Sequence, residues 1–176
     1  MEPFHSEEIL KRGVDPAALG QTQTQLKPVS AAGKQLIVGV PKENHPNENR
    51  VTLCPPTVKM LVANGHQVLV EKDAGKYAQF PDVAYSDAGA QICYSKEELY
   101  KKSQLLVKIA PLTHDELELL QMRQIVISAV HMAELDRRHL DVFRQKQITA
   151  LGYEFIQSAS GSLPLVRIMS EIAGIT

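Results

Sequence analysis

The chain has 176 residues, of which 44% are apolar and 22% are charged, and its net charge is −1 at pH 7. This length and balance predict one globular domain with a tail. Lys and Arg are scattered along the chain, which excludes the basic footprint of a nucleic-acid-binding protein and a polybasic membrane patch. No apolar run approaches the roughly 18 residues that span a bilayer, and the acidic start is unlike a secretory signal.

The two cysteines, Cys54 and Cys93, are far apart in the sequence. They lack the paired spacing of a zinc site and are too few for a disulfide framework, so we expect neither. No pair of histidines has the spacing of metal ligands, and we expect no metal. A reducing, cytoplasmic location is the default expectation for such a chain.

Residues 1–33 differ in composition from the rest and predict an arm followed by a linker. A short helix is expected between Ser6 and Arg12, whereas the glutamine-rich stretch that follows has little to bury. The alternative is a partly disordered tail. We expect the folded domain to occupy residues 34–162 and a separate helical segment to occupy residues 163–176.

Short apolar runs alternate with helical patterns after the arm. The apolar runs predict strands at residues 36–40, 67–70, 105–109, 124–128 and 148–150. Helices are predicted at residues 55–65, 114–120 and 135–145, and a further short helix is predicted to begin after Ser95; capping boxes begin at Ser95 and Thr113. This alternation predicts an α/β fold, a Rossmann-like parallel sheet with helices on both faces. Ligand-binding groups in such a sheet lie at the carboxyl ends of the strands.

The last segment predicts a helix with Ile168, Met169 and Ile172 along one side. A helix this short is marginal unless it docks on another element. Because the sequence stops two residues after Gly174, we expect the natural polypeptide to continue. We also expect the apolar side of this helix to be poorly packed on the domain of its own chain.

Two cationic residues follow predicted strands. Arg50 lies in the long polar loop after the first strand, where it is either a surface residue or a bidentate carboxylate ligand. Lys108 lies within an otherwise apolar run, and lysine is rarely buried without a partner. It either extends its amine to solvent or awaits a ligand.

His131 and Glu154 follow the next two strands. His131 suits proton transfer near neutral pH, with a hydrogen-bonded structural histidine as the alternative. Glu154 is either a functional carboxylate or a residue that orients a neighbour, and we favour the second interpretation. We expect Arg50, Lys108 and His131 to converge on one concave site, with an anion, water or carboxylate between the two cations.

The sequence contains no Gly-x-Gly pair, so it lacks the glycine-rich turn of a dinucleotide-binding domain. Neither the nucleophile elbow of the α/β-hydrolases nor a Walker loop is present. This part of the polypeptide is therefore not expected to bind a dinucleotide in the usual way by itself.

Ordered motifs along the chain resemble the family of the alanine dehydrogenases and the α subunits of proton-translocating pyridine nucleotide transhydrogenases. The matching stretches lie at residues 39–43, 48–51, 55–68, 71–75, 87–90, 107–108 and 169–174. The histidine after the strand that ends at Val130 favours the dehydrogenase branch. The local pattern here is Val130-His131-Met132-Ala133, where the family usually has Leu-His-Leu-Ala.

The resemblance implies a truncated substrate-binding domain of an enzyme that deaminates L-alanine to pyruvate and ammonia with NAD. It implies that Arg50 and Lys108 hold the substrate carboxylate and the developing carbonyl oxygen, and that His131 is the acid/base. Met169 would line the pocket and Ser170 would approach the NAD. The glycine-rich loop and the catalytic aspartate of the family would lie beyond Thr176, so we expect the 176-residue chain alone to be inactive. A homo-oligomer is also expected.

Two alternatives remain at this point. The chain could belong to a transhydrogenase α subunit, which serves a membrane proton pump, or it could be a non-catalytic binding or assembly module of the same fold. The coding sequence downstream of Thr176 distinguishes them. A glycine-rich domain with a soluble end would indicate the dehydrogenase, membrane-spanning helices the transhydrogenase, and a stop codon the module.

Overall fold

The computed structural model describes residues 35–45, 48–131 and 135–174, apart from the side chains of residues 172 and 173. All of these belong to one compact unit. The predicted arm of residues 1–33, with its short helix from Ser6 to Arg12, lies outside the described residues. No helix in the described part is long and apolar enough to cross a membrane.

Six strands form one sheet in the order β3-β2-β1-β4-β5-β6, and every neighbouring pair is parallel. The strands are β1 (Ile37–Val40), β2 (Gln67–Glu71), β3 (Gln91–Cys93), β4 (Leu105–Val107), β5 (Ile125–Ser128) and β6 (Thr149–Gly152). This is the strand order of the doubly wound Rossmann fold, with its reversal between β1 and β4. The predicted fold class, α/β with a Rossmann-like parallel sheet, is confirmed.

Among the described residues, six α-helices and two short 3₁₀ helices accompany the sheet. They are α2 (Pro55–Ala63), η2 (Lys76–Ala78), α3 (Asp82–Asp87), α4 (Lys96–Lys102), α5 (His114–Leu119), α6 (Arg137–Gln145), η3 (Tyr153–Phe155) and α7 (Pro164–Ala173). Proline begins α2, and Gly65 follows its end at a φ of 86°, as the sequence predicts. The sequence analysis missed η2, α3, β3 and η3.

Only one of the two predicted capping boxes is complete. At the start of α5, the Thr113 hydroxyl accepts a bond from the Glu116 N–H, and the Glu116 carboxylate accepts one from the Thr113 N–H. At the start of α4, Ser95 accepts from the Glu98 N–H. The Glu98 side chain instead pairs with Lys102, so the reciprocal bond of this capping box is not made.

Two apolar cores lie on opposite faces of the sheet. Along β2, Leu69 packs into one core, whereas Val68 and Val70 pack into the other, as the alternation of side chains in a strand requires. The first core includes residues of α4 and α5, with partly buried residues of α6, and the second includes residues of α2 and α3. Helices therefore cover both faces, although the side chains of residues 149–151 in β6 are exposed.

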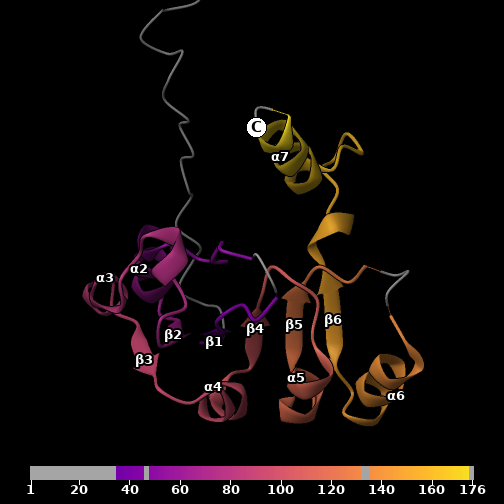
Figure 1. Cartoon of the computed structure of the whole chain (residues 1–176), viewed down its shortest axis with the longest axis horizontal. Helices are drawn as coiled ribbons and strands as arrows, with labels where there is room; N and C mark the ends of the chain where they lie inside the picture. The colour runs from indigo at the N-terminus through magenta and orange to yellow at the C-terminus, as the bar shows by residue number, and fades with distance from the viewer. Residues whose placement is uncertain (1–34, 46–47, 132–134, 175–176) are drawn as a thin grey trace, which may run out of the picture. The chain divides into compact units, whose positions relative to one another are not determined.

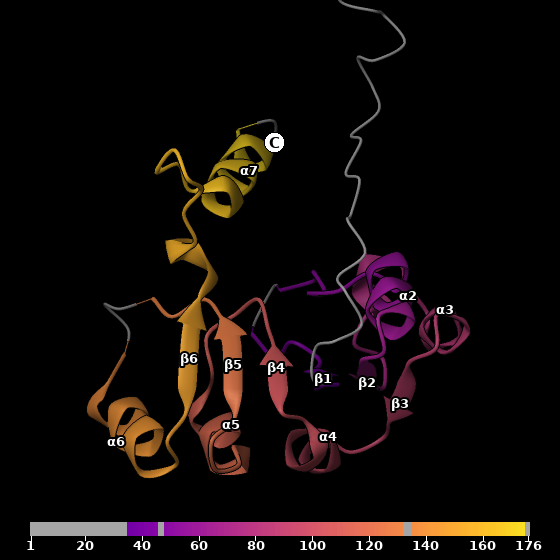
Figure 2. The same ribbon diagram turned by 180° about the vertical axis from the view of Figure 1, so that it is seen from behind.

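The segments that carry the candidate site residues lie at the carboxyl ends of the strands. In Figures 1 and 2, η3 continues from the end of β6 and leads to α7, which lies beyond this edge of the sheet. The apolar residues of α7 are poorly covered, as expected: Ile168 is 53% exposed and Met169 is 38% exposed. The side chain of Ile172 lies outside the described part.

Candidate functional site

A cavity of about 540 Å³ opens at the carboxyl ends of the strands. Its size falls within the range of small-molecule sites. Its walls come from the loop after β1, the loop between β4 and α5, the turn after β5, the start of α6, η3 and α7. The lining residues are His45, Glu48, Arg50, Ile109, Ala110, Pro111, Leu112, Thr113, His114, Ala129, Val130, His131, Leu135, His139, Tyr153 and Met169.

Arg50 lines this cavity and is held by Glu48. Its Nε donates to Glu48 Oε1 at 2.8 Å, and a second guanidinium nitrogen contacts Oε2, so the pair is bidentate. The hydrogen bond between these side chains raises the pKa of Arg50 and, in spite of burial, lowers that of Glu48. The Arg50 side chain is 55% exposed, so its guanidinium group remains accessible to solvent.

Lys108 is buried and is not among the residues that line the cavity. It lies one residue beyond the end of β4, and its amine is 2.9 Å from Glu116 Oε1 and 3.2 Å from Glu43 Oε2. The expected convergence of Arg50, Lys108 and His131 is therefore only partly seen. Arg50 and His131 share the cavity, whereas the Lys108 charge is neutralised by carboxylates of this chain.

Glu116 joins the Lys108 amine to the start of α5. Its Oε1 contacts Lys108 and, at 3.4 Å, Lys96, while its Oε2 accepts the capping bond from the Thr113 N–H at 2.9 Å. Burial raises the pKa of Glu116, but the charge of Lys108 and the bond from Thr113 outweigh it and lower this pKa below its ordinary value. Glu116 is thus ionised and fixed at both oxygens.

Glu43 shapes the cavity wall. Its carboxylate accepts bonds from the backbone N–H groups of Ile109, at 2.6 Å, and Ala110, at 3.4 Å, and both residues line the cavity. The carbonyl of Ile109 is also held, because it accepts a hydrogen bond from the Tyr153 hydroxyl at 3.0 Å. Residues that follow β1 and β6 therefore hold the loop that follows β4.

His131 lies at the turn after β5 and lines the cavity with an exposed side chain. Its backbone φ is 39°, which non-glycine residues rarely adopt. Glu154 Oε1 accepts bonds from the N–H groups of Val130, at 2.7 Å, and His131, at 3.0 Å. Glu154 therefore orients a neighbour, which is the interpretation that the sequence analysis favoured.

The two candidates on α7 differ in their positions. Met169 lines the cavity, as the resemblance implies. Ser170 does not line it, and its exposed hydroxyl donates to the Val166 carbonyl one turn earlier at 2.9 Å. The described residues leave Ser170 at the surface.

Several residues of the site escaped the sequence analysis. Glu43 and Glu116 pair with Lys108 from 65 and 8 residues away, and Glu116 was interpreted only as a capping residue. His114 and His139 line the cavity, although the sequence placed them on helices without a role. The spacing of Glu48 and Arg50, two residues apart, was a signal that could have predicted their pairing.

Comparison with known proteins identifies the family of the chain. The family described as "Alanine dehydrogenase/PNT, N-terminal domain" matches residues 39–173, more than half of the chain. The chain belongs to this family. The match includes every candidate residue named above, from Arg50 to Ser170.

Curated relatives of the chain are alanine dehydrogenases. Over 142 residues it is 39% identical to the alanine dehydrogenase of Methanococcus maripaludis, which covers 79% of this chain and 37% of that protein. It is 35% identical to the alanine dehydrogenase of Bacillus subtilis over 139 residues, which covers 79% of this chain and 36% of that protein. The chain thus spans little more than a third of the length of these relatives.

Solved structures of an L-alanine dehydrogenase and of a transhydrogenase also match the chain. An L-alanine dehydrogenase superposes with a TM-score of 0.74 at 36% identity, over 79% of this chain and 38% of the other. A transhydrogenase from Sinorhizobium meliloti superposes with a TM-score of 0.61 at 26% identity, over 68% of this chain and 35% of the other. Both branches of the family therefore share this fold.

Proposed function

We propose that the chain is the substrate-binding part of an NAD-dependent alanine dehydrogenase, which interconverts L-alanine with pyruvate and ammonia. The observation that carries the proposal is one cavity that presents both the Arg50 guanidinium and the His131 imidazole, in a chain whose curated relatives are alanine dehydrogenases. Catalysis is assigned to the complete polypeptide, and we place it in the cytoplasm as a homo-oligomer. L-Alanine or pyruvate is the proposed small-molecule partner, with no nucleic acid and no membrane.

In this proposal, Arg50 binds the substrate carboxylate. A guanidinium can make two parallel bonds to a carboxylate, and Arg50 already makes such a pair with Glu48. A substrate carboxylate would compete with the Glu48 carboxylate for the same guanidinium nitrogens of Arg50. Met169 would contact the small apolar side chain from the wall of the cavity.

We assign proton transfer to His131, because its imidazole is exposed in the cavity and suits acid/base chemistry near neutral pH. Lys108 is proposed to contact the substrate carboxylate and the oxygen of the developing carbonyl. For this contact its amine must leave the weaker of its two partners, Glu43 at 3.2 Å, and keep Glu116 at 2.9 Å. Until then, Lys108 supports the wall of the cavity through Glu43, which accepts hydrogen bonds from the N–H groups of Ile109 and Ala110.

The NAD cofactor accepts the hydride from the substrate in this reaction. The chain has no glycine-rich turn for a dinucleotide, so we propose that NAD binds mainly to another part of the complete protein. Ser170 would be the contribution of this chain. Its hydroxyl is exposed on α7, which lies beyond the carboxyl edge of the sheet.

The test measures L-alanine-dependent reduction of NAD by the complete polypeptide and by its Arg50→Gln and His131→Asn variants. We expect Arg50→Gln to raise the KM for alanine and pyruvate, and His131→Asn to lower kcat. The matched control is His66→Asn, because His66 lies outside the cavity and should leave both constants unchanged. Full activity in both cavity variants would refute the proposed site.

A transhydrogenase segment is the second candidate, since a transhydrogenase shares the fold. Its identity to this chain is 26%, against 36% for the L-alanine dehydrogenase. Transfer of hydride between two nicotinamide nucleotides by the complete protein, without any response to alanine, would favour this candidate.

A further inference from the structure

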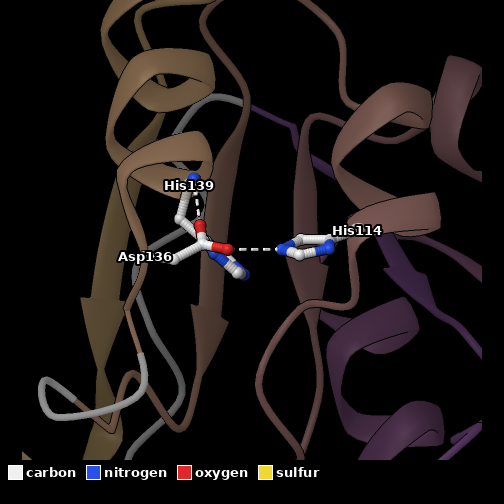
Figure 3. Close-up of side chains that lie close together, drawn as sticks. All are labelled: His114, Asp136 and His139. Atoms are coloured by element: carbon white, nitrogen blue, oxygen red, sulfur yellow. Dashed lines mark hydrogen bonds and ion pairs between the residues drawn. The ribbon is translucent and has the colours of Figure 1, made fainter.

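Three side chains, of which His114 and His139 line the cavity, form a cluster that the proposed dehydrogenase reaction does not use. His114 begins α5, Asp136 caps the start of α6, and His139 lies in the first turn of α6. Figure 3 shows the Asp136 carboxylate between the two imidazoles, 2.7 Å from His114 Nε2 and 2.7 Å from His139 Nδ1. We call these residues the His114–Asp136–His139 cluster.

The contacts of His139 place its Nδ1 against a second acceptor. Its Nε2 lies 3.0 Å from the Leu112 carbonyl oxygen, which only accepts, so Nε2 must carry a hydrogen. In the neutral ring Nδ1 then has a lone pair, and this lone pair faces the Asp136 Oδ1 at 2.7 Å. Two acceptors at this distance repel each other. A second proton on the imidazole or a metal ion removes the conflict.

The cluster offers the ligands that divalent transition metals prefer. The two imidazole nitrogens and one carboxylate oxygen all lie within 4.8 Å of one another. Sites with two histidines and one carboxylate bind ions such as Zn²⁺ and Fe²⁺, whereas Mg²⁺ and Ca²⁺ prefer oxygen ligands. The side chains of His114 and Asp136 are 50% and 46% exposed, which leaves room for water to complete the coordination.

The surroundings already orient these ligands. The carbonyl that accepts from Nε2 fixes the ring of buried His139, as backbone carbonyls commonly do for metal-binding histidines. Asp136 Oδ1 also accepts a hydrogen bond from the His139 N–H at 3.0 Å, which fixes the carboxylate at the start of α6. A carboxylate carries a full negative charge, which outweighs the partial positive charge at the start of this helix.

We propose that the His114–Asp136–His139 cluster is a binding site for a divalent transition-metal ion. Zn²⁺ is the ion with which the site is tested. The ligands would be His114 Nε2, His139 Nδ1 and one oxygen of Asp136. Ligands of tetrahedral zinc lie about 3.4 Å apart, for bonds of about 2.1 Å. The contacts of 2.7 Å in the cluster therefore need to widen by less than about 1 Å for zinc to enter.

A bound ion would link the starts of α5 and α6. These helices come from separate crossovers of the sheet and already contact each other. The ion would replace two hydrogen bonds to Asp136 by three bonds to one centre, on the wall formed by His114 and His139. The thermal stability of the chain should therefore rise with added zinc, because the ion binds the folded state.

The test is calorimetric titration of the chain with zinc, beside the His114→Ala, Asp136→Asn and His139→Gln variants. Asparagine also caps helices well, so Asp136→Asn keeps the start of α6. We expect one Zn²⁺ per chain and a loss of affinity of more than about tenfold in each variant. The controls are His66→Gln and Asp141→Asn, which remove a histidine and an α6 carboxylate outside the cluster.

Circular dichroism and thermal unfolding accompany each titration. Zinc should raise the Tm of the unaltered chain and of both controls, but not that of the three variants. If buried His139 proves essential for folding, His114→Ala decides the result, because the His114 side chain is half exposed. No zinc binding by the unaltered chain, or equal binding by folded His114→Ala, would overturn the proposal and assign the cation at His139 to a proton.

Discussion

Glu154, just beyond the end of β6, holds the backbone of His131, just beyond the end of β5: the His131 N–H donates to Glu154 Oε1 at 3.0 Å. The same oxygen accepts the Val130 N–H at 2.7 Å. We expect Glu154→Ala to lower the free energy of unfolding by about 1–3 kcal/mol, because two donors lose their acceptor. Glu154→Gln keeps a carbonyl acceptor and should lose less. Denaturant titration measures both, and equal losses would contradict this role.

The stability of the chain should depend on pH through Glu116. Its pKa in the folded chain is lowered, because Lys108 and the Thr113 N–H overcome the effect of burial. Glu116 therefore contributes stability that is fully present above its unfolded pKa of about 4.3 and is lost as the pH falls through the lower folded pKa.

Urea unfolding at about pH 7 and about pH 3 tests this contribution, because the lower pH lies well below the unfolded pKa. Glu116→Gln should be less stable than the unaltered chain at the higher pH, and the difference should shrink at the lower pH. Asp115→Asn, at the exposed neighbouring residue, is the matched control and should not change the pH dependence. An unchanged difference at the two pH values would exclude Glu116 as the source.

Lys108→Met should destabilise the fold as well as reduce catalysis. It leaves Glu43 and Glu116 buried without their shared cation, at a cost of about 3–5 kcal/mol on the scale of broken buried ion pairs. Adding Glu116→Gln to Lys108→Met should recover part of this loss, because one uncompensated charge is removed. Chemical denaturation of the single and double variants measures the recovery, and its absence would mean that the ion pair is not the cause.

The catalytic effect of Lys108→Met is measured in the complete protein. A direct contact with the developing oxyanion predicts a loss of about 3 kcal/mol or more in transition-state stabilisation, visible in kcat/KM. Lys108→Arg should not restore it, since the guanidinium is larger and planar. A stable Lys108→Met enzyme with unchanged kcat/KM would limit Lys108 to supporting the wall.

Gly39 leaves no room for a larger residue in β1. A Cβ atom there would lie 2.1 Å from Ser103 Oγ and 3.0 Å from a Leu106 methyl carbon. We expect Gly39→Ala to cost about 1–3 kcal/mol through overpacking, and Ser103→Gly in the same chain to relieve part of it. Gly174→Ala meets only atoms at 3.5 Å and beyond, so it serves as the control. Thermal unfolding compares the three variants, and a Gly39→Ala chain as stable as the control would contradict the packing argument.

The sequence predicted the strands with clear apolar runs but missed β3 and α3. β1 and β5 bury apolar residues within four-residue runs. β3 has three residues, of which Cys93 alone is buried, and α3 has six residues with Tyr85 alone buried. Neither has enough buried positions to show a period, so tertiary contacts determine them.

The sequence predicted that Arg50 and His131 lie at one edge of the sheet, but it did not predict how the side chains of this edge pair. Arg50 and His131 follow strands of one parallel sheet, which brings them to the same edge without any local sequence signal. The partners of Lys108 could not be predicted in this way. Glu43 lies 65 residues away, and the orientation of Glu116 depends on the packing of α5 on the sheet. Side-chain pairing across loops follows from packing, which composition and periodicity do not encode.

The loops at the carboxyl edge brace one another across the strands. Glu43 holds Ile109 and Ala110 from the loop after β1, Tyr153 holds Ile109 from the segment after β6, and Glu154 holds the turn at His131. Some of the hydrogen bonds that hold these loops therefore come from a neighbouring segment. An engineer who transplanted a single loop from a relative to alter substrate choice would also release the neighbouring loops, so these segments must be exchanged as one set.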